Sequence, residues 1–220
     1  MKYKIIAFII AVLFIFGLLM NTYINTDNTL SNIKDKIIRL HVVANSDSPH
    51  DQAIKLNIRD AIIKELSPIL CDLTEPEKAK SIIADNLDKI KETAENELER
   101  LGEKYDITVD LGIHEFPTKI YGNLSFPAGE YQALDIVIGE GNGKNWWCVM
   151  FPPLCFVDIA QGVLSEQSLE ELKEVLSQEE IDILKSDKEE TSVKMKFKIA
   201  EIYKKLNSKV AKIIGKKSEM

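Results

Sequence analysis

The chain has 220 residues, of which 45% are hydrophobic and 29% are charged, and its net charge at pH 7 is −7. This length allows one ordinary hydrophobic core with short appendages, and the acidic balance argues against a nucleic-acid partner. The three histidines and three cysteines follow no spacing known for metal sites, so we expect neither a metal nor a cofactor.

The N-terminus carries two lysines and then an uncharged apolar run over residues 5–20. As a helix, this run would be about 24 Å long, somewhat short of the ~30 Å hydrocarbon core of a membrane. Because the lysines hold the N-terminus in the cytoplasm, we expect the chain beyond about residue 25 to be exported. No small-residue cleavage site follows, so residues 1–25 are either a cleaved signal peptide or a signal anchor; a buried core helix is the other interpretation.

Residues 26–35 are polar and are interpreted as a tether, and the first strand follows over residues 37–44. Its side chains alternate between an apolar face and a more polar face, which indicates a half-buried strand. The apolar face carries Ile38, Leu40 and Val42, and the other face carries Arg39, His41 and Val43. After a turn, Ser48 is expected to cap a helix that begins at Pro49 and ends near Leu70.

A second helix is expected over residues 75–101, ended by Gly102. The strands of the sheet are then expected over residues 105–116, 118–121, 131–139 and 145–150. Two short helices are expected to follow, one opened by Ser165 and one by a capping box of Ser177 and Glu180. Runs of helix followed by hairpin-connected strands predict an α+β fold. We therefore predict a single two-layer domain over residues 36–185, with a mostly antiparallel sheet covered by helices.

A charged linker over residues 186–192 precedes a basic C-terminal segment. Residues 194–220 hold nine lysines and two glutamates, so their charge of +7 leaves −14 on the rest of a chain whose total is −7. Apolar residues recur at helical spacing over residues 193–215, which predicts an amphipathic helix. This helix either lies on an anionic membrane surface or packs against the acidic body of the domain.

Residues 139–158 form the most distinctive stretch, G-E-G-N-G-K-N-W-W-C-V-M-F-P-P-L-C-F-V-D, with both tryptophans and two of the three cysteines. The glycines favour a turn, the aromatic run a strand, and the two prolines end that strand. Cys148 and Cys155 lie seven residues apart across the prolines. They either form a disulfide, as is common after export, or remain two buried thiols.

Motifs of catalysis are missing from the sequence. The glycines of residues 139–143 precede a strand, whereas a phosphate-binding loop needs a helix at that point. The chain contains no H-E-x-x-H, C-x-x-C or G-x-S-x-G pattern. We expect the chain not to be an enzyme. Two alternatives stay open: a secreted thiol-dependent hydrolase, in which His41 would serve Cys148 or Cys155, and a passive septal or envelope-binding module.

Several segments of the sequence resemble the stage II sporulation protein R family. They are I-R-L-H-V-V-A-N-S-D-S over residues 38–48 with the following Asp51, Gln52, Lys55, Leu56, Arg59 and Asp60, F-P-A-G-E-Y-x-A-L over residues 126–134, the tryptophan, cysteine and proline pattern of residues 143–158, and V-x-x-x-F-K-I over residues 193–199. The resemblance covers roughly residues 36–200. It implies an intercellular signal of endospore-forming bacteria, made in the forespore and exported into the space between the two septal membranes. There it would activate a membrane-embedded aspartic protease of the mother cell, which processes the precursor of sigma-E.

The large apolar side chains of residues 146–156 are candidates for the contact with this partner, because tryptophan is enriched among interface hot spots. Neighbours in a strand point to opposite faces, so we expect at most one tryptophan to meet the partner. The candidate contacts are Trp146, Trp147, Phe151, Pro152, Pro153, Leu154 and Phe156, with Arg39, His41, Asn45 and Asp47 setting the register. The alternative is that the whole stretch belongs to the hydrophobic core.

Overall fold

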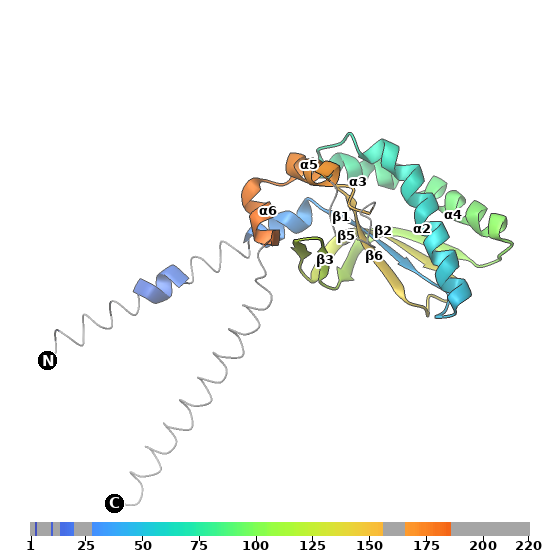
Figure 1. The fold of residues 1–220 in the computed structure, drawn as a ribbon, viewed down its shortest axis with the longest axis horizontal. Coiled ribbons are helices and arrows are strands. Elements are labelled where there is room, and N and C mark those ends of the chain that lie inside the picture. Colours follow the sequence, from blue (N-terminus) through green and yellow to red (C-terminus); the bar gives the residue numbers. More distant parts are fainter. Residues whose placement is uncertain (1–2, 4–9, 11–13, 20–27, 156–165, 186–220) are drawn as a thin grey trace, which may run out of the picture.

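A four-stranded sheet organises the computed structural model, which describes residues 3, 10, 14–19, 28–155 and 166–185 (Figure 1). The strands β1 (Ile38–Val43), β2 (Ile107–Phe116), β5 (Gly129–Ile138) and β6 (Asn145–Phe151) lie in the order β2-β5-β1-β6. β1 runs parallel to β5 and antiparallel to β6, and β2 runs antiparallel to β5. The fold is α+β as predicted, but its sheet is mixed because β5 inserts between β2 and β1.

Three helices cover one face of the sheet: α2 (Pro49–Leu70), α3 (Pro76–Asp85) and α4 (Leu87–Leu101) (Figure 1). The Ser48 side chain accepts a hydrogen bond from the N–H of Asp51 and so caps α2 as predicted, and Gly102 ends α4 with φ 79°. The single helix predicted over residues 75–101 was wrong, since Asn86 separates two helices. Its side-chain amide donates to the Ile82 carbonyl at 2.7 Å, and this local bond competes with helix continuation.

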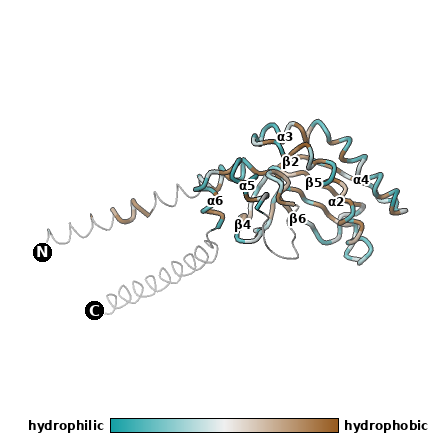
Figure 2. The backbone as a smooth tube through the Cα atoms, turned by 45° about the horizontal axis from the view of Figure 1, so that its top comes forward, coloured by the Kyte–Doolittle hydropathy of each residue, from teal (hydrophilic) through white to brown (hydrophobic). Residues whose placement is uncertain are grey.

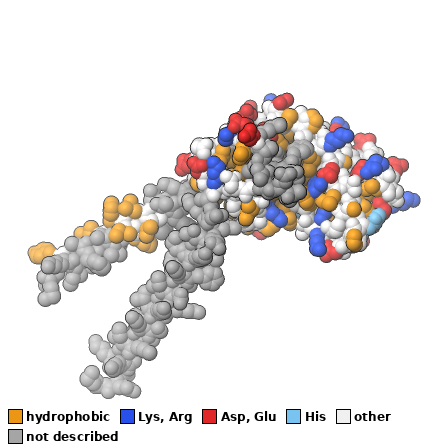
Figure 3. All heavy atoms as spheres, viewed as in Figure 1, with side chains coloured by type: hydrophobic (Ala, Val, Ile, Leu, Met, Phe, Trp, Pro, Cys, Tyr) orange, Lys and Arg blue, Asp and Glu red, His pale blue; other side chains and the backbone are white. Residues whose placement is uncertain are grey.

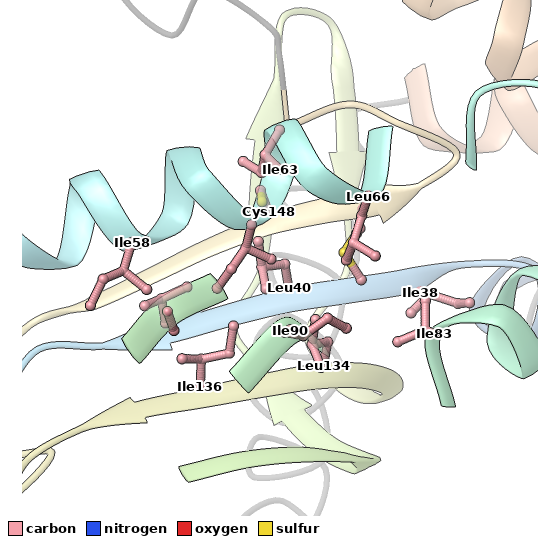
Figure 4. Close-up of a cluster of buried hydrophobic side chains, with 14 of the residues drawn as sticks. Ile38, Leu40, Ile58, Ile63, Leu66, Ile83, Ile90, Leu134, Ile136 and Cys148 are labelled. Carbon is pink, nitrogen blue, oxygen red and sulfur yellow. The ribbon is translucent and has the colours of Figure 1, made fainter. Parts of the chain in front are cut away.

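Side chains of these helices and of the facing strand residues form the first core (Figure 4). Hydrophobic and hydrophilic residues alternate along α2 and α4 in Figure 2, which is the pattern of helices with one buried face. The fully buried members include Leu40 of β1, Leu134 and Ile136 of β5, and Ile58 and Ile62 of α2. This core fixes α2 and α4 against the sheet.

The opposite face of the sheet is covered at one end by a second core. Its cover consists of residues 28–35, the hairpin of β3 (Lys119–Tyr121) and β4 (Leu124–Phe126), and the helices α5 (Glu166–Val175) and α6 (Gln178–Lys185). The second core includes Ile33, Phe116, Phe126, Tyr131, Val149, Leu172, Leu176 and Ile181. Where two layers were predicted, the fold therefore has a partial third layer, and β1 is buried on both faces at this end.

Residues 28–35, which were predicted to belong to a polar tether, are helical, and Ile33 is fully buried in the second core. Just after this helix, Lys36 Nζ lies 2.8 Å from Glu180 Oε2 of α6. Glu180 also accepts from the N–H of Ser177 at 2.7 Å, and its own N–H donates to the Ser177 hydroxyl at 3.3 Å, so the predicted capping box is confirmed. The helix of residues 28–35 is thus tied to α6, the last described helix.

Several predicted segments lie outside the described residues: most of the apolar run of residues 5–20, Phe156, the linker over residues 186–192 and the C-terminal helix over residues 193–215. None of the helices in the described ranges has the length and hydropathy of a membrane-spanning segment. Residues 14–19 are helical, and the side chains of Phe14 and Leu19 are 68% and 65% exposed. On the folded body, acidic and basic side chains are interspersed over the face seen in Figure 3.

Candidate functional site

The two neighbouring tryptophans point to opposite faces of β6, in agreement with strand alternation. Trp146 packs against the first core, and the guanidinium of Arg59 lies 4.0 Å from the centre of its ring. Trp147 packs against the second core and stacks on His41, with ring centroids 3.7 Å apart and an interplanar angle of 3°. Both tryptophans are half-buried. Each therefore anchors one face of the sheet, while part of the residue stays accessible.

His41 is the centre of a polar cluster on the face of the sheet that carries Trp147. Its Nδ1 lies 2.5 Å from Asp135 Oδ1, and its Nε2 lies 2.8 Å from Asn145 Oδ1. Strand register brings these residues together, because Asp135 of β5 and Trp147 of β6 are the direct neighbours of His41 on either side. We call His41, Asp135, Asn145 and Trp147 the His41 cluster. The side chains of His41 and Asp135 are 13% and 16% exposed, so this cluster reaches the surface.

The edge strand β2 extends the polar row by one more strand. Asp110 stands opposite Asp135 in the β2–β5 ladder, and its Oδ2 lies 3.0 Å from His114 Nε2. Gly112 lies between Asp110 and His114, and a Cβ on it would come within 2.9 Å of Asp110 Oδ2. Glycine at this position therefore leaves the space in which the two side chains meet. The row Asp110, Asp135, His41 crosses three strands and brings two carboxylates side by side.

Arg39, a predicted partner contact, is instead fully buried beneath the second core. Its Nε donates to the Cys148 carbonyl at 3.1 Å, and its Cζ lies 4.5 Å and 5.0 Å from the ring centres of Phe116 and Tyr131. Burial lowers the pKa of the Arg39 guanidinium, although the nearby Tyr121 and Tyr131 act in the opposite direction. The side chain holds the second core to the sheet and is not accessible to a partner.

Asn45 and Asp47, two further predicted contacts, hold the β5–β6 loop against the turn after β1. Asn45 Oδ1 accepts from the N–H of Glu140 at 3.0 Å, and Asp47 Oδ1 accepts from the N–H of Lys144 at 2.7 Å. The loop glycines permit this approach: a Cβ on Gly139 would lie 2.3 Å from Asn45 Oδ1. Gly139 also has φ 57°, a region that favours glycine. The polar side chains of this turn are thus engaged within the fold.

Asp51 is the hydrogen-bonding centre of the same turn. Its carboxylate accepts from the hydroxyl of Ser46 at 2.5 Å, from the amide of Asn45 at 3.0 Å and from the hydroxyl of Tyr105 at 3.0 Å. The hydrogen bonds from Ser46, Asn45 and Tyr105 lower the pKa of the Asp51 carboxyl, and the one from Ser46 contributes most. The turn after β1, the start of α2 and the approach to β2 are therefore linked through one buried carboxylate.

The Pro-Pro turn, whose prolines were predicted to contact the partner, is buried. Phe151 is 0% and Leu154 is 1% exposed, and both prolines between them are also buried. A disulfide between Cys148 and Cys155 closes the turn, with the two Cα atoms 5.4 Å apart. The N–H of Leu154 donates to the carbonyl of Val149 at 3.1 Å. These residues stabilise the end of β6 from inside, which agrees with the core alternative for this part of the stretch.

The cysteine and histidine that a thiol-dependent hydrolase would need are not brought together. Cys148 faces the first core and is bonded to Cys155, whereas His41 points to the opposite face of the sheet. A sheet therefore separates the proposed base from the proposed nucleophile. Among the residues that the structure describes, no group of three or more His, Cys, Asp or Glu side chains could hold a metal ion.

Sequence reasoning missed Asp135 and Asn145, the two residues that hold the His41 ring. Asp135 lies in a strand whose alternation marks one face as polar, and that signal was available. What was missing was the strand order: only the insertion of β5 beside β1 places the two polar faces next to each other. Asn145 opens the strand that carries the tryptophans, and only the antiparallel β1–β6 register shows that it reaches His41.

The fold and the site together define a small α+β protein with a polar and aromatic surface cluster beside a second core. A family model described as Stage II sporulation protein R (spore_II_R) matches residues 34–161. The Stage II sporulation protein R of Bacillus subtilis (strain 168) is 43% identical over 168 residues, which cover 74% of this chain and 75% of that protein. The chain belongs to the stage II sporulation protein R family. No solved structure matches it.

Proposed function

We propose that this chain is an exported signalling protein of sporulation that activates a membrane-embedded aspartic protease, which then processes the precursor of sigma-E. Membership of the stage II sporulation protein R family is the observation that carries the role in sporulation. The protease is the partner that the family resemblance implies. Two features of the chain support signalling by contact: the thiol site is not assembled, and the His41 cluster lies at the surface.

The proposal places the chain beyond about residue 25 in the space between the two septal membranes. The apolar run of residues 5–20 supports export, and the exposed apolar side chains of Phe14 and Leu19 suit a lipid environment. The disulfide between Cys148 and Cys155 also suits an oxidising compartment outside the cytoplasm. A reporter active only in the cytoplasm, fused after Met220, should stay silent, and activity of that reporter would contradict export.

Within this proposal, the His41 cluster is the docking surface. Trp147 is a half-buried aromatic residue, and Asn145 and Asp135 supply polar groups beside it, which is the composition of interface hot spots with a polar rim. The buried Pro-Pro turn and Arg39 hold β6 and β1 in place beneath this surface. Binding would activate the protease only to the extent that the active arrangement binds more tightly than the resting one.

Co-expression tests the proposed function. The chain, the protease and the sigma-E precursor are produced together in a host that lacks all three, and cleavage of the precursor is followed by immunoblotting. Cleavage should require the chain and should be lost with Trp147→Ala at unchanged protein level. Cleavage that proceeds equally without the chain would contradict the proposal. Retention of the chain in wall fractions without the protease would instead favour an envelope-binding module.

A further inference from the structure

The two edges of the sheet differ in whether their backbone groups are engaged. At the β6 edge, the carbonyl of Trp147 accepts from the hydroxyl of Tyr121 at 3.2 Å, and the carbonyl of Val149 accepts from the N–H of Leu154 at 3.1 Å. The strand then ends at Pro152, which has no N–H to offer a ladder. This edge is closed by its own fold.

The β2 edge is open over the length of the strand. All ten residues of β2 pair in register with β5, without a bulge. The N–H of Gly139 donates to the carbonyl of Asp106, the residue before β2, at 2.8 Å. In an antiparallel ladder, every second residue directs its backbone N–H and C=O groups toward the neighbouring strand. Because Asp106 does so, the even-numbered residues of β2 bond to β5, and the odd-numbered residues turn their N–H and C=O groups outward. In the described part of the chain, none of these outward groups has a hydrogen-bond partner.

The side chains of β2 continue the inner face of the sheet to this open edge. Val109 and Leu111 are partly buried and pack against the first core, whereas Ile113 is 61% exposed. Ile113 also lines a cleft of about 660 Å³ with Lys80 and Gln132. β2 contains no lysine, proline or bulge, which are three of the devices that protect an edge strand from pairing. The inner side of the edge is therefore apolar from Val109 to Ile113, and its one charged residue is Glu115, near the end of the strand.

We propose that the β2 edge binds an extended segment of another protein by strand addition. The added strand would present apolar side chains toward Val109, Leu111 and Ile113, and a lysine or arginine opposite Asp110. Strand addition supplies affinity through backbone hydrogen bonds and specificity through alternate side chains. This inference concerns binding only and does not rest on the proposed protease activation.

Charge and periodicity decide between the possible occupants. Residues 106–116 carry Asp106, Asp110 and Glu115 and no lysine or arginine, so a cationic strand is favoured over a second copy of this acidic edge. The lysine-rich residues 194–220 have the right charge, but their apolar residues recur at helical spacing. A strand needs a period of two residues, so this segment does not match the edge.

Peptide binding to the full-length chain in detergent micelles tests the proposal. The probe is a fluorescently labelled synthetic peptide as long as β2, in which valine alternates with lysine and threonine, and binding is followed by fluorescence anisotropy. A peptide of the same composition with helical spacing, and one with glutamate in place of lysine, should each bind at least about tenfold more weakly. Hydrogen exchange should slow at the outward amides of Val109, Leu111 and Ile113.

Ile113→Pro removes one outward N–H and leaves the ladder to β5 intact, so it should weaken binding roughly three- to tenfold. Ile113→Thr keeps that N–H and is the matched control. A peptide that is N-methylated on its bonding edge should not bind, which tests the geometry without changing the protein.

Binding that is equal for all peptides, or unaffected by both Ile113→Pro and N-methylation, would overturn the proposal. It would also be overturned by a homodimer that dissociates on Ile113→Pro, or by binding seen only after deletion of residues 194–220, because the occupant would then be the chain itself.

Discussion

The two faces of the sheet come from alternating residues of the same strands, but they are used differently. The face under α2 and α4 is apolar along its whole length, from Ile38 to Val42 in β1. The other face is apolar only at one end, and the polar His41 lies beside the buried Arg39 region. The difference shows that alternation identifies two faces but not which of them is covered. A surface site has formed where the cover of the second face stops.

Arg39 marks the boundary between these two uses. It is a charged side chain on the face that sequence alternation classifies as polar, and yet it is fully buried between aromatic rings. A guanidinium tolerates this position because it can stack on rings while its Nε bonds to a carbonyl. His41, two residues later on the same face, reaches solvent. Two residues along the strand therefore separate a structural cation from a candidate binding group.

Phe151→Ala should cause the largest change, because it removes a fully buried ring from the first core. We expect the free energy of unfolding to fall by about 3 to 5 kcal/mol, measured by urea denaturation. Ile120→Ala, at a side chain that is 69% exposed, is the matched control and should change it by less than about 0.5 kcal/mol. If Phe151→Ala stopped precursor cleavage without loss of stability, the ring would be a partner contact after all.

Loss of the disulfide should have the next largest effect. It closes a loop between residues separated by seven positions, so Cys148→Ser with Cys155→Ser should lower the free energy of unfolding by about 2 to 3 kcal/mol. Reductant should destabilise the natural chain to the same extent and leave the double variant unchanged. Cys71→Ser is the control, since Cys71 is a free thiol. Equal sensitivity of the double variant to reductant would mean that the bond does not stabilise the fold.

The sequence was sufficient for the elements whose signals are local. The cap at Ser48, the glycine stop at Gly102 and the capping box at Ser177 are confirmed because each depends on residues within one turn of helix. The β3–β4 hairpin was only half predicted, since β4 has three residues and little periodicity. The mixed sheet could not be predicted, because the insertion of β5 depends on contacts far apart in the chain.

The candidate site shows the same division. Alternation placed Trp146 and Trp147 on opposite faces, and the structure agrees. The burial of Pro152 and Pro153 was not predictable from their composition, because an apolar turn looks the same whether it packs inward or outward. What decides it is long-range packing: Phe151 joins the first core and Leu154 joins the second, whose other parts include residues 30–37 and 169–184. Composition therefore identified the important stretch but not its exposed residues.

Acid should destabilise the fold through two carboxylates, Asp51 at the start of α2 and Glu180 of α6. Hydrogen bonds, the one from Ser46 first, lower the pKa of Asp51 in the folded protein. Burial alone would raise the pKa of Glu180, but the hydrogen bonds from Lys36 and Ser177 outweigh burial and lower it. A depressed folded pKa means that the stabilisation is complete above the unfolded pKa, about 4, and is lost as pH falls through the folded value. Asp51→Asn and Glu180→Gln should each flatten this acid-dependent loss in urea titrations at decreasing pH. An unchanged pH profile in both variants would contradict the assignment.

His41→Gln should have the smallest effect on stability and the clearest effect on signalling. Glutamine can keep a hydrogen bond to Asn145 or Asp135, so the free energy of unfolding should fall by no more than about 1 kcal/mol. It cannot replace the stacking on Trp147, and the shape of the His41 cluster should change. If this cluster is the docking surface, cleavage of the sigma-E precursor in the co-expression host should decrease strongly.

The matched control is His50→Gln, because His50 also faces a carboxylate, with its Nε2 2.7 Å from Glu103 Oε1, but lies at the start of α2. Its side chain is 66% exposed, so the substitution should change neither stability nor cleavage. Equal loss of cleavage in both variants would show that the assay responds to any lost histidine. Full cleavage with His41→Gln and with Trp147→Ala would move the docking surface away from this face, and the open β2 edge would then be the next surface to test.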